Sequence, residues 1–413
     1  MPADMASRRV AITGMGLVTP LGVGIDPLWQ GLLEGRSAVR PAEDLDLADM
    51  PITHYGQLPR FDFDDYLDPK GSALWSKASK LAVMCAGLAV EDAGLSDGGL
   101  PADDTGVILG TGYGCTFEFE EYYGQWFKRG WKRLKPVSIP KMMPNAPASH
   151  LGIQLGLRGI QFTVSTACSS GAIATGLALE RIRAGDLEAC VTGGIDAQIN
   201  ASTAGAWCAL RVLSKRNDPT ASRPFSVDRD GLVLAEGGAV LVLEEWERAR
   251  SRGARIYAEV LGAGASNDAV NIVGPDEQGE VRATEAALRD AGLDAAAIDY
   301  VNAHGTSTDA NDANETAVLK RIFGQRAHAI PVSSVKGNLG HTMGAAGAID
   351  LAVTALALTH QRVPPTAHFV AGDERCDLDY VPEGPRDVAL THAISNSFGF
   401  GGQNSVVVLK RAD

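Results

Sequence analysis

A cysteine among very small residues is the first candidate for chemistry in this sequence. Cys168 lies in the segment STACSSG, directly after a strand-like run at 162–164 and before a helical pattern. A free cysteine is often only a small buried hydrophobe. At the N-terminus of a helix, however, its thiolate is stabilised by the helix dipole and by unpaired backbone N–H groups. Cys168 is therefore a candidate nucleophile that would attack a thioester and form an acyl-cysteine.

Two histidines in glycine-rich segments are the second candidates. His304 lies in NAHGTSTDAND and His341 in VSSVKGNLGHTMGAAG, both in loops after predicted strands. A single histidine in such a loop is more often structural, but two favour an active site. Two neutral imidazoles could donate N–H groups to an oxygen that gains negative charge during a reaction. A Cys/His hydrolase is the competing enzyme class, but it leaves the second histidine and the nearby Lys336 without a role.

These residues must be positioned by strands and helices that alternate along the chain, a pattern that predicts an α/β fold. An Ala-rich helix that ends in DAGL and is followed by a strand occurs twice, first as 86–95 with 106–112 and later as 285–293 with 298–307. In both copies the glycine is placed to cap the C-terminus of the helix. The repeat indicates two halves of common design.

A second repeated unit contains the candidate residues themselves. The segments 162–182 and 330–358 each read as a strand, a loop of small residues and an amphipathic helix. We therefore predict an N-terminal half, 1–252, with the cysteine and a C-terminal half, 253–413, with both histidines. Each half would open with a strand, at 8–16 and at 254–264. In a duplicated fold, matching loops meet across a pseudo-twofold axis, so the cysteine would face the two histidine loops.

Composition excludes several other classes. The 413 residues are 45% hydrophobic and carry a net charge of −13, which argues against a nucleic-acid-binding protein. The N-terminal segment shows no secretory signal, and no apolar run is long enough to span a bilayer, so a cytoplasmic protein without a membrane segment is expected. Six scattered cysteines without CxxC spacing suggest reduced thiols, and no metal site is expected.

The motifs, taken in order, resemble one family. The segments STACSSG, NAHGTSTDAND, VSSVKGNLGHTMGAAG and NSFGFGG (396–402) are similar in order and spacing to those of the β-ketoacyl-acyl-carrier-protein synthases of the thiolase superfamily. The likeness runs from about Arg9 to Lys410. It implies a thiolase-like fold of duplicated halves in five α-β-α-β-α layers, with two five-stranded mixed sheets, in a molecule that is usually a dimer.

The resemblance also implies a reaction. An acyl group on Cys168 would undergo decarboxylative Claisen condensation with malonyl-acyl-carrier protein. The enzyme would need no cofactor of its own, because the phosphopantetheine arm is carried by the partner protein. Intact Cys168 argues against the inactive chain-length-factor relatives, which lack it, and the intact set of motifs is hard to reconcile with a non-catalytic scaffold.

The family pattern assigns further roles by position. His304 and His341 would bind the enolate, and the backbone N–H groups of Cys168 and Phe400 would hold the acyl-enzyme oxyanion. Lys336 would order the histidines, with Glu315 and ordered water. The remaining assignments are support by Asp312 and Glu315, pantetheine binding by Thr306 and Thr308, and a gate formed by Phe398 and Phe400.

A basic segment is a candidate docking site for an acidic carrier protein. FKRGWKRLK (127–135) is strongly basic within an acidic chain, although such a run is more often a solvated loop. The predicted docking residues are Lys128, Arg129, Lys132 and Arg133, with Arg211 nearer the tunnel mouth by resemblance.

Departures from the family pattern bear on the pathway. Asp309 stands where fatty-acid elongators usually have proline, and Gln403 where they usually have threonine. The segments ANDANETAVLKR and LAEGG look more like type II polyketide ketosynthases. Tyr113 and Trp207 would narrow the acyl tunnel for short or unsaturated chains, or would equally fill an interface. We predict a type II polyketide-like enzyme, with fatty-acid elongation as the alternative, acting as a homodimer or with a chain-length-factor-like partner.

Overall fold

The strands form two five-stranded halves with the same internal order. The computed structural model describes residues 8–45, 47, 50–96 and 98–412. In the first half the strands lie in the order β6-β5-β7-β8-β1, and in the second in the order β11-β10-β14-β15-β9. Each half therefore places its first strand at one edge and its third strand at the other. This identical order supports the duplication that the sequence repeats predicted.

The strand bounds follow the predicted repeats, with shifted ends. In the first half they are β1 (Val10–Thr19), β5 (Thr105–Gly110), β6 (Gln161–Val164), β7 (Ala189–Asp196) and β8 (Gly237–Glu245). In the second half they are β9 (Ala258–Asn267), β10 (Tyr300–Asn302), β11 (Val332–Ser333), β14 (His392–Gly399) and β15 (Gln403–Arg411). The short strand β2 (Gly22–Val23) pairs with β1, and two small pairs stand apart, β3 (Arg40–Pro41) with β4 (His54–Tyr55) and β12 (Arg362–Val363) with β13 (Arg386–Asp387).

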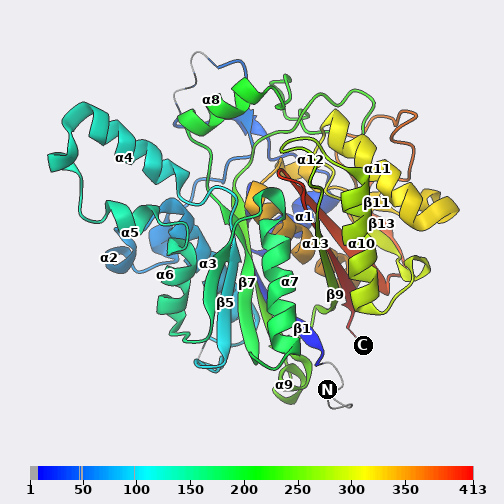
Figure 1. Cartoon of the computed structure of the whole chain (residues 1–413), viewed down its shortest axis with the longest axis horizontal. Coiled ribbons are helices and arrows are strands. Elements are labelled where there is room, and N and C mark those ends of the chain that lie inside the picture. Colours follow the sequence, from blue (N-terminus) through cyan, green and yellow to red (C-terminus); the bar gives the residue numbers. More distant parts are fainter. Residues whose placement is uncertain (1–7, 46, 48–49, 97, 413) are drawn as a thin grey trace.

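Helices fill the layers on both sides of each sheet. The α-helices are α1 (Ile25–Leu33), α2 (Pro69–Ser72), α3 (Lys77–Asp92), α4 (Thr116–Arg129), α5 (Ser138–Met142), α6 (Ala146–Leu155), α7 (Ser170–Arg183), α8 (Ala201–Leu210), α9 (Trp246–Ser251), α10 (Glu277–Ala291), α11 (Asp309–Phe323), α12 (Lys336–Leu339) and α13 (Ala346–His360). Figure 1 shows the five layers from left to right: α3 and α6, the first sheet, α7 and α13, the second sheet, then α10 and α11. The five-layered fold expected from the resemblance is confirmed.

The two sheets are joined rather than separate, which differs from the prediction. Strands β1 and β9 pair through Ala11 with Glu259 and through Ile12 with Ala258, so that one continuous sheet runs through both halves. The predicted boundary at 252/253 falls in the connection between α9 and β9. The contact between the first strands of the two halves is short, and most of the cohesion comes from the helices between the sheets.

Glycines let the outer helices lie directly on the first strand of each half. A Cβ at Gly14 or Gly16 of β1 would come within 2.2 and 1.9 Å of carbonyl oxygens of α3. A Cβ at Gly264 of β9 would come within 2.2 Å of a carbonyl oxygen of α10, and one at Gly262 within 2.6 Å of a backbone nitrogen there. Any side chain at these positions would push the helix off the sheet. The repeated glycine pairs therefore serve the same packing in both halves.

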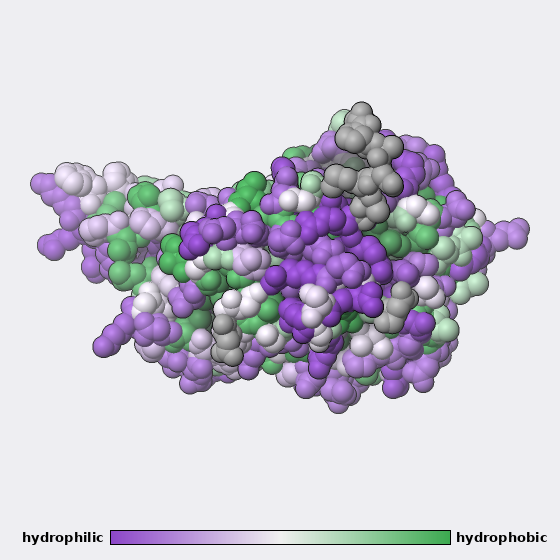
Figure 2. Space-filling view, turned by 90° about the horizontal axis from the view of Figure 1, so that it is seen from below, coloured by the Kyte–Doolittle hydropathy of each residue, from purple (hydrophilic) through white to green (hydrophobic). Residues whose placement is uncertain are grey.

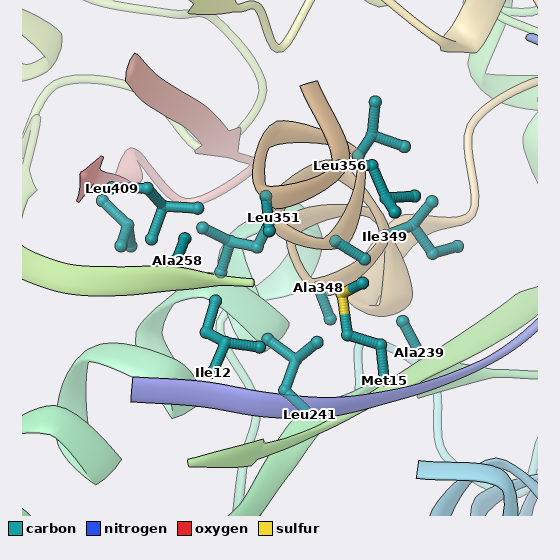
Figure 3. Close-up of a cluster of buried hydrophobic side chains, with 14 of the residues drawn as sticks. Ile12, Met15, Ala239, Leu241, Ala258, Ala348, Ile349, Leu351, Leu356 and Leu409 are labelled. Carbon is teal, nitrogen blue, oxygen red and sulfur yellow. The ribbon is translucent and has the colours of Figure 1, made fainter. Parts of the chain in front are cut away.

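The central helix α13 is the most apolar element of the core. With the turn before it, the 18-residue segment Met343–His360 has a mean hydropathy of 1.3, long and apolar enough to cross a membrane. However, 89% of this segment is buried inside the molecule, so it is a core helix. Figure 3 shows its side chains, among them Ile349 and Leu351, packed between Ile12 and Leu241 of the first half and Leu409 of the second.

One arm projects from this layered body. Helix α4 and the following turn η2 (Trp131–Arg133) extend to the left in Figure 1. The same projection is at the left of Figure 2, where apolar side chains interrupt the hydrophilic surface. Its exposed large apolar side chains are Phe117, Tyr123, Trp126, Phe127 and Trp131.

Candidate active site

The turn that carries Cys168 begins in a conformation that side chains rarely adopt. Strand β6 ends at Val164, and a single 3-10 turn, η3 (Ala167–Ser169), leads into α7. Ala167 has φ = +52°, in the left-handed region. The hydroxyl of Ser170 accepts a hydrogen bond from the backbone N–H of Thr166 at 2.8 Å, which closes the turn. Cys168 is thereby fixed just before the N-terminus of α7, with only 7% of the residue exposed.

His341 lies in direct contact with the cysteine. Its Nε2 is 3.1 Å from the Cys168 Sγ. The backbone N–H of Met343 donates to the Nδ1 of the same ring at 3.3 Å, so that Nδ1 is an acceptor. In a neutral imidazole the proton then resides on Nε2, directed at the sulfur. His341 therefore presents an N–H donor to the position where a thioester on Cys168 would react.

His304 completes a compact cluster. Its ring packs edge-on against the His341 ring, with centroids 5.2 Å apart. The Cys168 sulfur and one nitrogen of each histidine all lie within 4.8 Å of one another. Three such atoms could share a metal ion, whereas the sequence patterns led us to expect no metal site. The fold thus brings together the three residues predicted to react.

Burial controls the charge of this cluster. It raises the pKa of Cys168 to about 11, although the backbone N–H groups of Phe400 and of Cys168 itself, together with Lys336, act to lower that pKa. The prediction of a stabilised thiolate is therefore only partly met, because desolvation outweighs those donors. Burial, with the nearby Lys336 charge, holds the pKa of His304 and His341 well below the usual histidine value, so both rings are neutral at pH 7.

Lys336 has a partner that the sequence analysis did not assign. Its Nζ forms an ion pair with Asp350 Oδ2 at 2.8 Å, and both side chains are 2% exposed. Asp350 stands out in the sequence as the one charge in the apolar helix α13, which was the available signal. The predicted partner, Glu315, makes no ion pair with Lys336 among the described residues, although the Lys336 charge acts to lower its pKa.

Glu315 instead holds the loop of His304. Its two carboxylate oxygens accept the backbone N–H groups of His304 and Gly305, each at 2.8 Å. The Asn396 amide donates to the same carboxylate at 3.0 Å. Burial raises the pKa of Glu315, while these donors and Lys336 act to lower it. Glu315 therefore fixes the backbone that positions His304.

Asp312 fixes the next part of the same loop. It accepts the backbone N–H of Thr306 at 3.0 Å and that of Phe225 at 2.7 Å. Burial raises the pKa of Asp312 to about 7. The hydroxyls of Thr306 and Thr308 are 2.9 Å apart, and Thr308 caps the N-terminus of α11. Asp312 thus supports the segment that was predicted to bind the pantetheine arm.

The first residue of α11, Asp309, takes part in an ion-pair network. Its carboxylate pairs with the buried Arg229 at 3.2 Å and with the exposed Arg375. Where proline is usual in fatty-acid elongators, this chain thus has an acidic residue that joins α11 to two arginines. A carboxylate at a helix N-terminus is also favoured by the helix dipole.

The cluster opens into a cavity of about 220 Å³. Phe398 and Phe400 line it, as do Thr306 and Thr308. Phe398 packs edge-on against the His304 ring, with centroids 6.0 Å apart. Both predicted gate residues and both predicted arm-binding threonines are therefore in place around one cavity.

The two aromatic residues predicted for the acyl tunnel differ in position. Trp207 is buried, lines the cavity and packs at 5.8 Å from the Phe400 ring. Tyr113 lies 6.3 Å from the Trp207 ring, is 39% exposed and is absent from the described lining of this cavity. Met343, which no sequence signal indicated, is closer to the reacting atom, with its Sδ 4.0 Å from the Cys168 Sγ.

The predicted docking residues lie in two places. Arg211, the C-cap of α8, is exposed between Leu210 and Val212, which line the cavity. Lys128, Arg129, Lys132 and Arg133 are all exposed on the projecting arm. In Figure 1 the arm is at the far left, whereas α8 is at the top. Within one chain the structure therefore does not gather these five residues into one patch.

Family models match both halves of the chain. The model of the beta-ketoacyl synthase N-terminal domain matches residues 7–249, and that of the C-terminal domain matches residues 257–370. The chain belongs to the β-ketoacyl synthase family. Its members are acyltransferases, which agrees with a cysteine and two neutral histidines gathered at one cavity.

Curated relatives and solved structures match over nearly the whole chain. A 3-oxoacyl-[acyl-carrier-protein] synthase 2 of Synechocystis is 39% identical over 413 residues, covering 99% of both chains. One of Staphylococcus aureus is 38% identical, covering 98% of this chain and 99% of its own. The ishigamide ketosynthase/chain length factor superposes with a TM-score of 0.93 at 32% identity, covering 99% and 100% of the chains. A Burkholderia phymatum beta-ketoacyl synthase gives a TM-score of 0.92 at 36% identity, covering 98% and 100%.

Proposed function

We propose that this β-ketoacyl synthase condenses an acyl group on Cys168 with malonyl-acyl-carrier protein. The acyl group first moves from its carrier thioester to the cysteine sulfur, and the carrier leaves as a free thiol. Malonyl thioester then loses CO2, and the electron pair of the broken bond forms an enolate. The enolate carbon attacks the acyl-cysteine carbonyl and expels the cysteine sulfur. The observation that carries the proposal is the His341 Nε2 directed at the Cys168 Sγ at 3.1 Å.

The two histidines act as donors to the malonyl thioester oxygen. Both rings are neutral, and the hydrogen bond from Met343 to Nδ1 of His341 leaves its Nε2–H free for the substrate. One nitrogen of His304 lies within 4.8 Å of one nitrogen of His341 and of the Cys168 sulfur, so that two donors could reach one substrate oxygen. Donors fixed before the reaction stabilise the developing negative charge without having to reorganise.

The acyl-enzyme carbonyl has its own pair of donors. The backbone N–H groups of Phe400 and Cys168 both point at the sulfur and lower the pKa of the thiol. In the acyl-enzyme the same groups would hold the oxygen of the tetrahedral intermediate. The buried pair of Lys336 and Asp350 keeps a positive charge near both histidines, which favours their neutral form.

The partner that delivers the substrate is an acyl-carrier protein. One structural neighbour is described as a type II PKS acyl-carrier protein in complex with its ketosynthase bound to the hexaketide, with a TM-score of 0.90 at 31% identity. In this chain Thr306 and Thr308 line the way to Cys168 and would bind the carrier's arm, which supplies the only prosthetic group that the proposed reaction uses. Arg211 at the mouth would contact the acidic carrier.

The projecting arm indicates a second subunit. Phe127 is 81% exposed and Trp131 66%, and both are next to the basic residues of the arm. Apolar side chains this exposed are typical of an interface. A structural neighbour contains a chain length factor beside its ketosynthase. We therefore expect two chains to associate through the arm, which would bring the arm's basic residues to the partner's cavity mouth.

The names of the relatives and the shape of the cavity both bear on the pathway. The curated relatives are 3-oxoacyl-[acyl-carrier-protein] synthases, while two structural neighbours are ketosynthases of ishigamide and type II polyketide systems. Trp207 against Phe400 narrows the cavity next to Cys168, and a flat acyl group loses less rotational freedom there than a flexible one. This favours short or unsaturated acyl groups and a polyketide-like pathway, with fatty-acid elongation as the second candidate.

Acylation by a panel of carriers tests the proposed function. The protein is incubated with acyl-carrier proteins that carry short, unsaturated or long saturated chains, and its intact mass and acylated peptide are measured. We expect one acyl group on Cys168 and none in Cys168→Ala, with Cys208→Ala as the matched control that still loads. Acylation of Cys168→Ala would refute the site, and fastest loading and extension of long saturated chains would favour fatty-acid elongation.

A further inference from the structure

One wall of the cavity holds a carboxyl group that the proposed chemistry does not use. Glu280 lies in the first turn of α10, is fully buried and lines the same cavity as Cys168 and Thr306. Neither of its carboxyl oxygens has a hydrogen-bond partner among the described residues. A buried polar group without a partner is costly and uncommon, so a carboxyl that faces a cavity indicates a missing partner.

The surroundings favour the neutral form of this carboxyl. Burial raises the pKa of Glu280 well above its usual value, and the nearby acids Glu315, Asp268 and Asp276 raise it further. Asn314 on α11 is close enough to lower that pKa, but its amide nitrogen also completes no hydrogen bond. A protonated carboxyl carries one donor and one free acceptor side by side. Glu280 is therefore equipped for an uncharged group that both donates and accepts.

The neighbouring acid, Asp268, differs from Glu280 because it has hydrogen-bond partners within the protein. Asp268 also lines the cavity, but it accepts the Asn404 amide at 2.6 Å and the backbone N–H of Asp276 at 3.2 Å. Its hydrogen bonds are thus made within the protein. Two carboxyls lie in one wall, and only that of Glu280 remains for a ligand.

A secondary amide is the group that matches a neutral carboxyl, because its N–H and C=O can pair with the acid's two oxygens. If the proposed function holds, the arm that passes Thr306 toward Cys168 carries two secondary amides and has no other group that both donates and accepts through a planar unit. We propose that the Glu280 carboxylic acid hydrogen-bonds a secondary amide of the carrier's pantetheine arm. Glu280 would then position the malonyl thioester at the histidines.

The test pairs a substituted residue with a substituted arm. Glu280→Leu keeps the bulk and removes the hydrogen bonds, Glu280→Gln keeps a donor and an acceptor, and the exposed Glu285→Gln on the same helix is the control. Each protein is given malonyl-pantetheine and an analogue whose two amides are replaced by esters. Condensation with an acylated Cys168 gives kcat/KM, and thermal unfolding confirms the fold.

We expect the wild type to lose about tenfold in kcat/KM when the amides become esters, the size of one good hydrogen bond. Glu280→Leu should lose about tenfold with the amide substrate, mainly in KM, and nothing more with the ester. Glu280→Gln should recover most of the loss, and Glu285→Gln should match the wild type. If Glu280→Leu does not fold, Glu280→Ala, which removes the carboxyl without adding bulk, takes its place, and it should lose the preference for the amide substrate.

Three results would overturn the inference. An equal loss with both substrates would show a purely structural role, and unchanged kinetics of Glu280→Leu would show no contact. Preferred binding of a thioester with a protonated amine, lost in Glu280→Gln, would show a cation site instead. Each of these leaves acylation of Cys168 intact. A wild type that never forms acyl-Cys168 would instead refute the proposed function, so the two failures are distinguishable.

Discussion

The two halves of this molecule make the same turn and use it differently. After β6 the first half forms η3 with Ala167 at φ = +52°, and after α12 the second half forms η6 (Met343–Ala345) with Met343 at φ = +51°. Both turns lead into the central helices. In the first half the next residue is Cys168, the proposed nucleophile, whereas in the second it is Gly344, whose N–H donates to Asp196 at 2.6 Å. The turn of the first half holds the thiol, whereas the turn of the second half donates a hydrogen bond to a buried carboxylate.

Each half also has a buried carboxylate that accepts backbone N–H groups, and the two carboxylates hold different parts of the site. Asp196, at the end of β7, accepts the backbone N–H groups of Gly112 and Tyr113 at 2.9 Å, in the loop after β5. Glu315 accepts two N–H groups of the loop after β10, the equivalent strand, and that loop carries His304. The first carboxylate therefore fixes the surroundings of the cysteine, and the second fixes a histidine. We infer that the two halves arose by duplication and that later substitutions gave them different roles in the proposed reaction.

The largest effect is expected from breaking the buried ion pair of the second half. Lys336→Met would leave Asp350 charged and unpaired in the core, at a cost of about 3–5 kcal/mol in the free energy of unfolding. The double variant Lys336→Met/Asp350→Leu should regain most of that stability in denaturant unfolding, yet condense slowly. A double variant with normal activity would show that the pair has no part in the reaction.

Removing either histidine should be almost as costly to the reaction. His304→Ala or His341→Ala removes one donor to the enolate and should raise the barrier to condensation by about 2.7–4 kcal/mol. Because both rings are held neutral, the rate of CO2 release from malonyl thioester should stay flat between pH 6 and pH 8 in the wild type. A strong change of that rate across this range would show that a histidine must be charged or must lose its proton.

Replacing the Asp196 and Glu315 carboxylates one at a time tests whether the two halves serve different half-reactions. Asp196→Asn and Glu315→Gln each place an amide group among backbone N–H donors and should cost about 1–3 kcal/mol in stability. The first should mainly slow acyl loading of Cys168, and the second should mainly slow CO2 release from malonyl thioester. Equal losses in both half-reactions for both variants would show that the halves do not divide the work.

The raised pKa of the thiol predicts a steep alkylation profile. Only the thiolate reacts, and the pKa of Cys168 is raised to about 11 by burial, so its rate with iodoacetamide should rise about tenfold for each pH unit between pH 7 and pH 10. Mass spectrometry of the Cys168 peptide measures this rate. A rate that levels off below pH 8 would show that the donors of the turn overcome desolvation.

The smallest effect is expected on the surface. Charge reversal at Lys128 and Arg129 should raise KM for acyl-carrier protein several-fold at low salt and should leave small thioester mimics unaffected. Matching losses with carrier and mimic would point to a damaged fold rather than to docking.

Sequence reasoning could single out the residues proposed to react because their surroundings are unusual. Cys168, His304 and His341 lie in segments of glycine and other small residues, and such motifs can be recognised in a single sequence. The repeated segments predicted the duplication, and the resemblance to the family implied the layered fold. Asp196 gives no such signal, and Asp350 shows only as the single charge in an apolar helix, because the role of each depends on a distant partner.

The sequence could not show how deeply each residue is buried or how strongly burial desolvates it. The thiolate expected at the start of α7 is opposed by burial, which depends on all the layers around Cys168. In the same way Tyr113 and Trp207 could be paired by resemblance, but only the structure shows that Trp207 alone of the two lines the cavity. Burial arises from packing between segments far apart in the chain, so local patterns do not contain it.

Release of CO2 from malonyl-acyl-carrier protein tests the central claim most directly. If the first half supplies the nucleophile and the second half the enolate donors, Cys168→Ala should take up no acyl group but still release CO2. His304→Ala should become acylated at Cys168 and release CO2 at least about a hundredfold more slowly than the wild type. CO2 release by His304→Ala at the wild-type rate, or acylation of Cys168→Ala at another residue, would contradict the account.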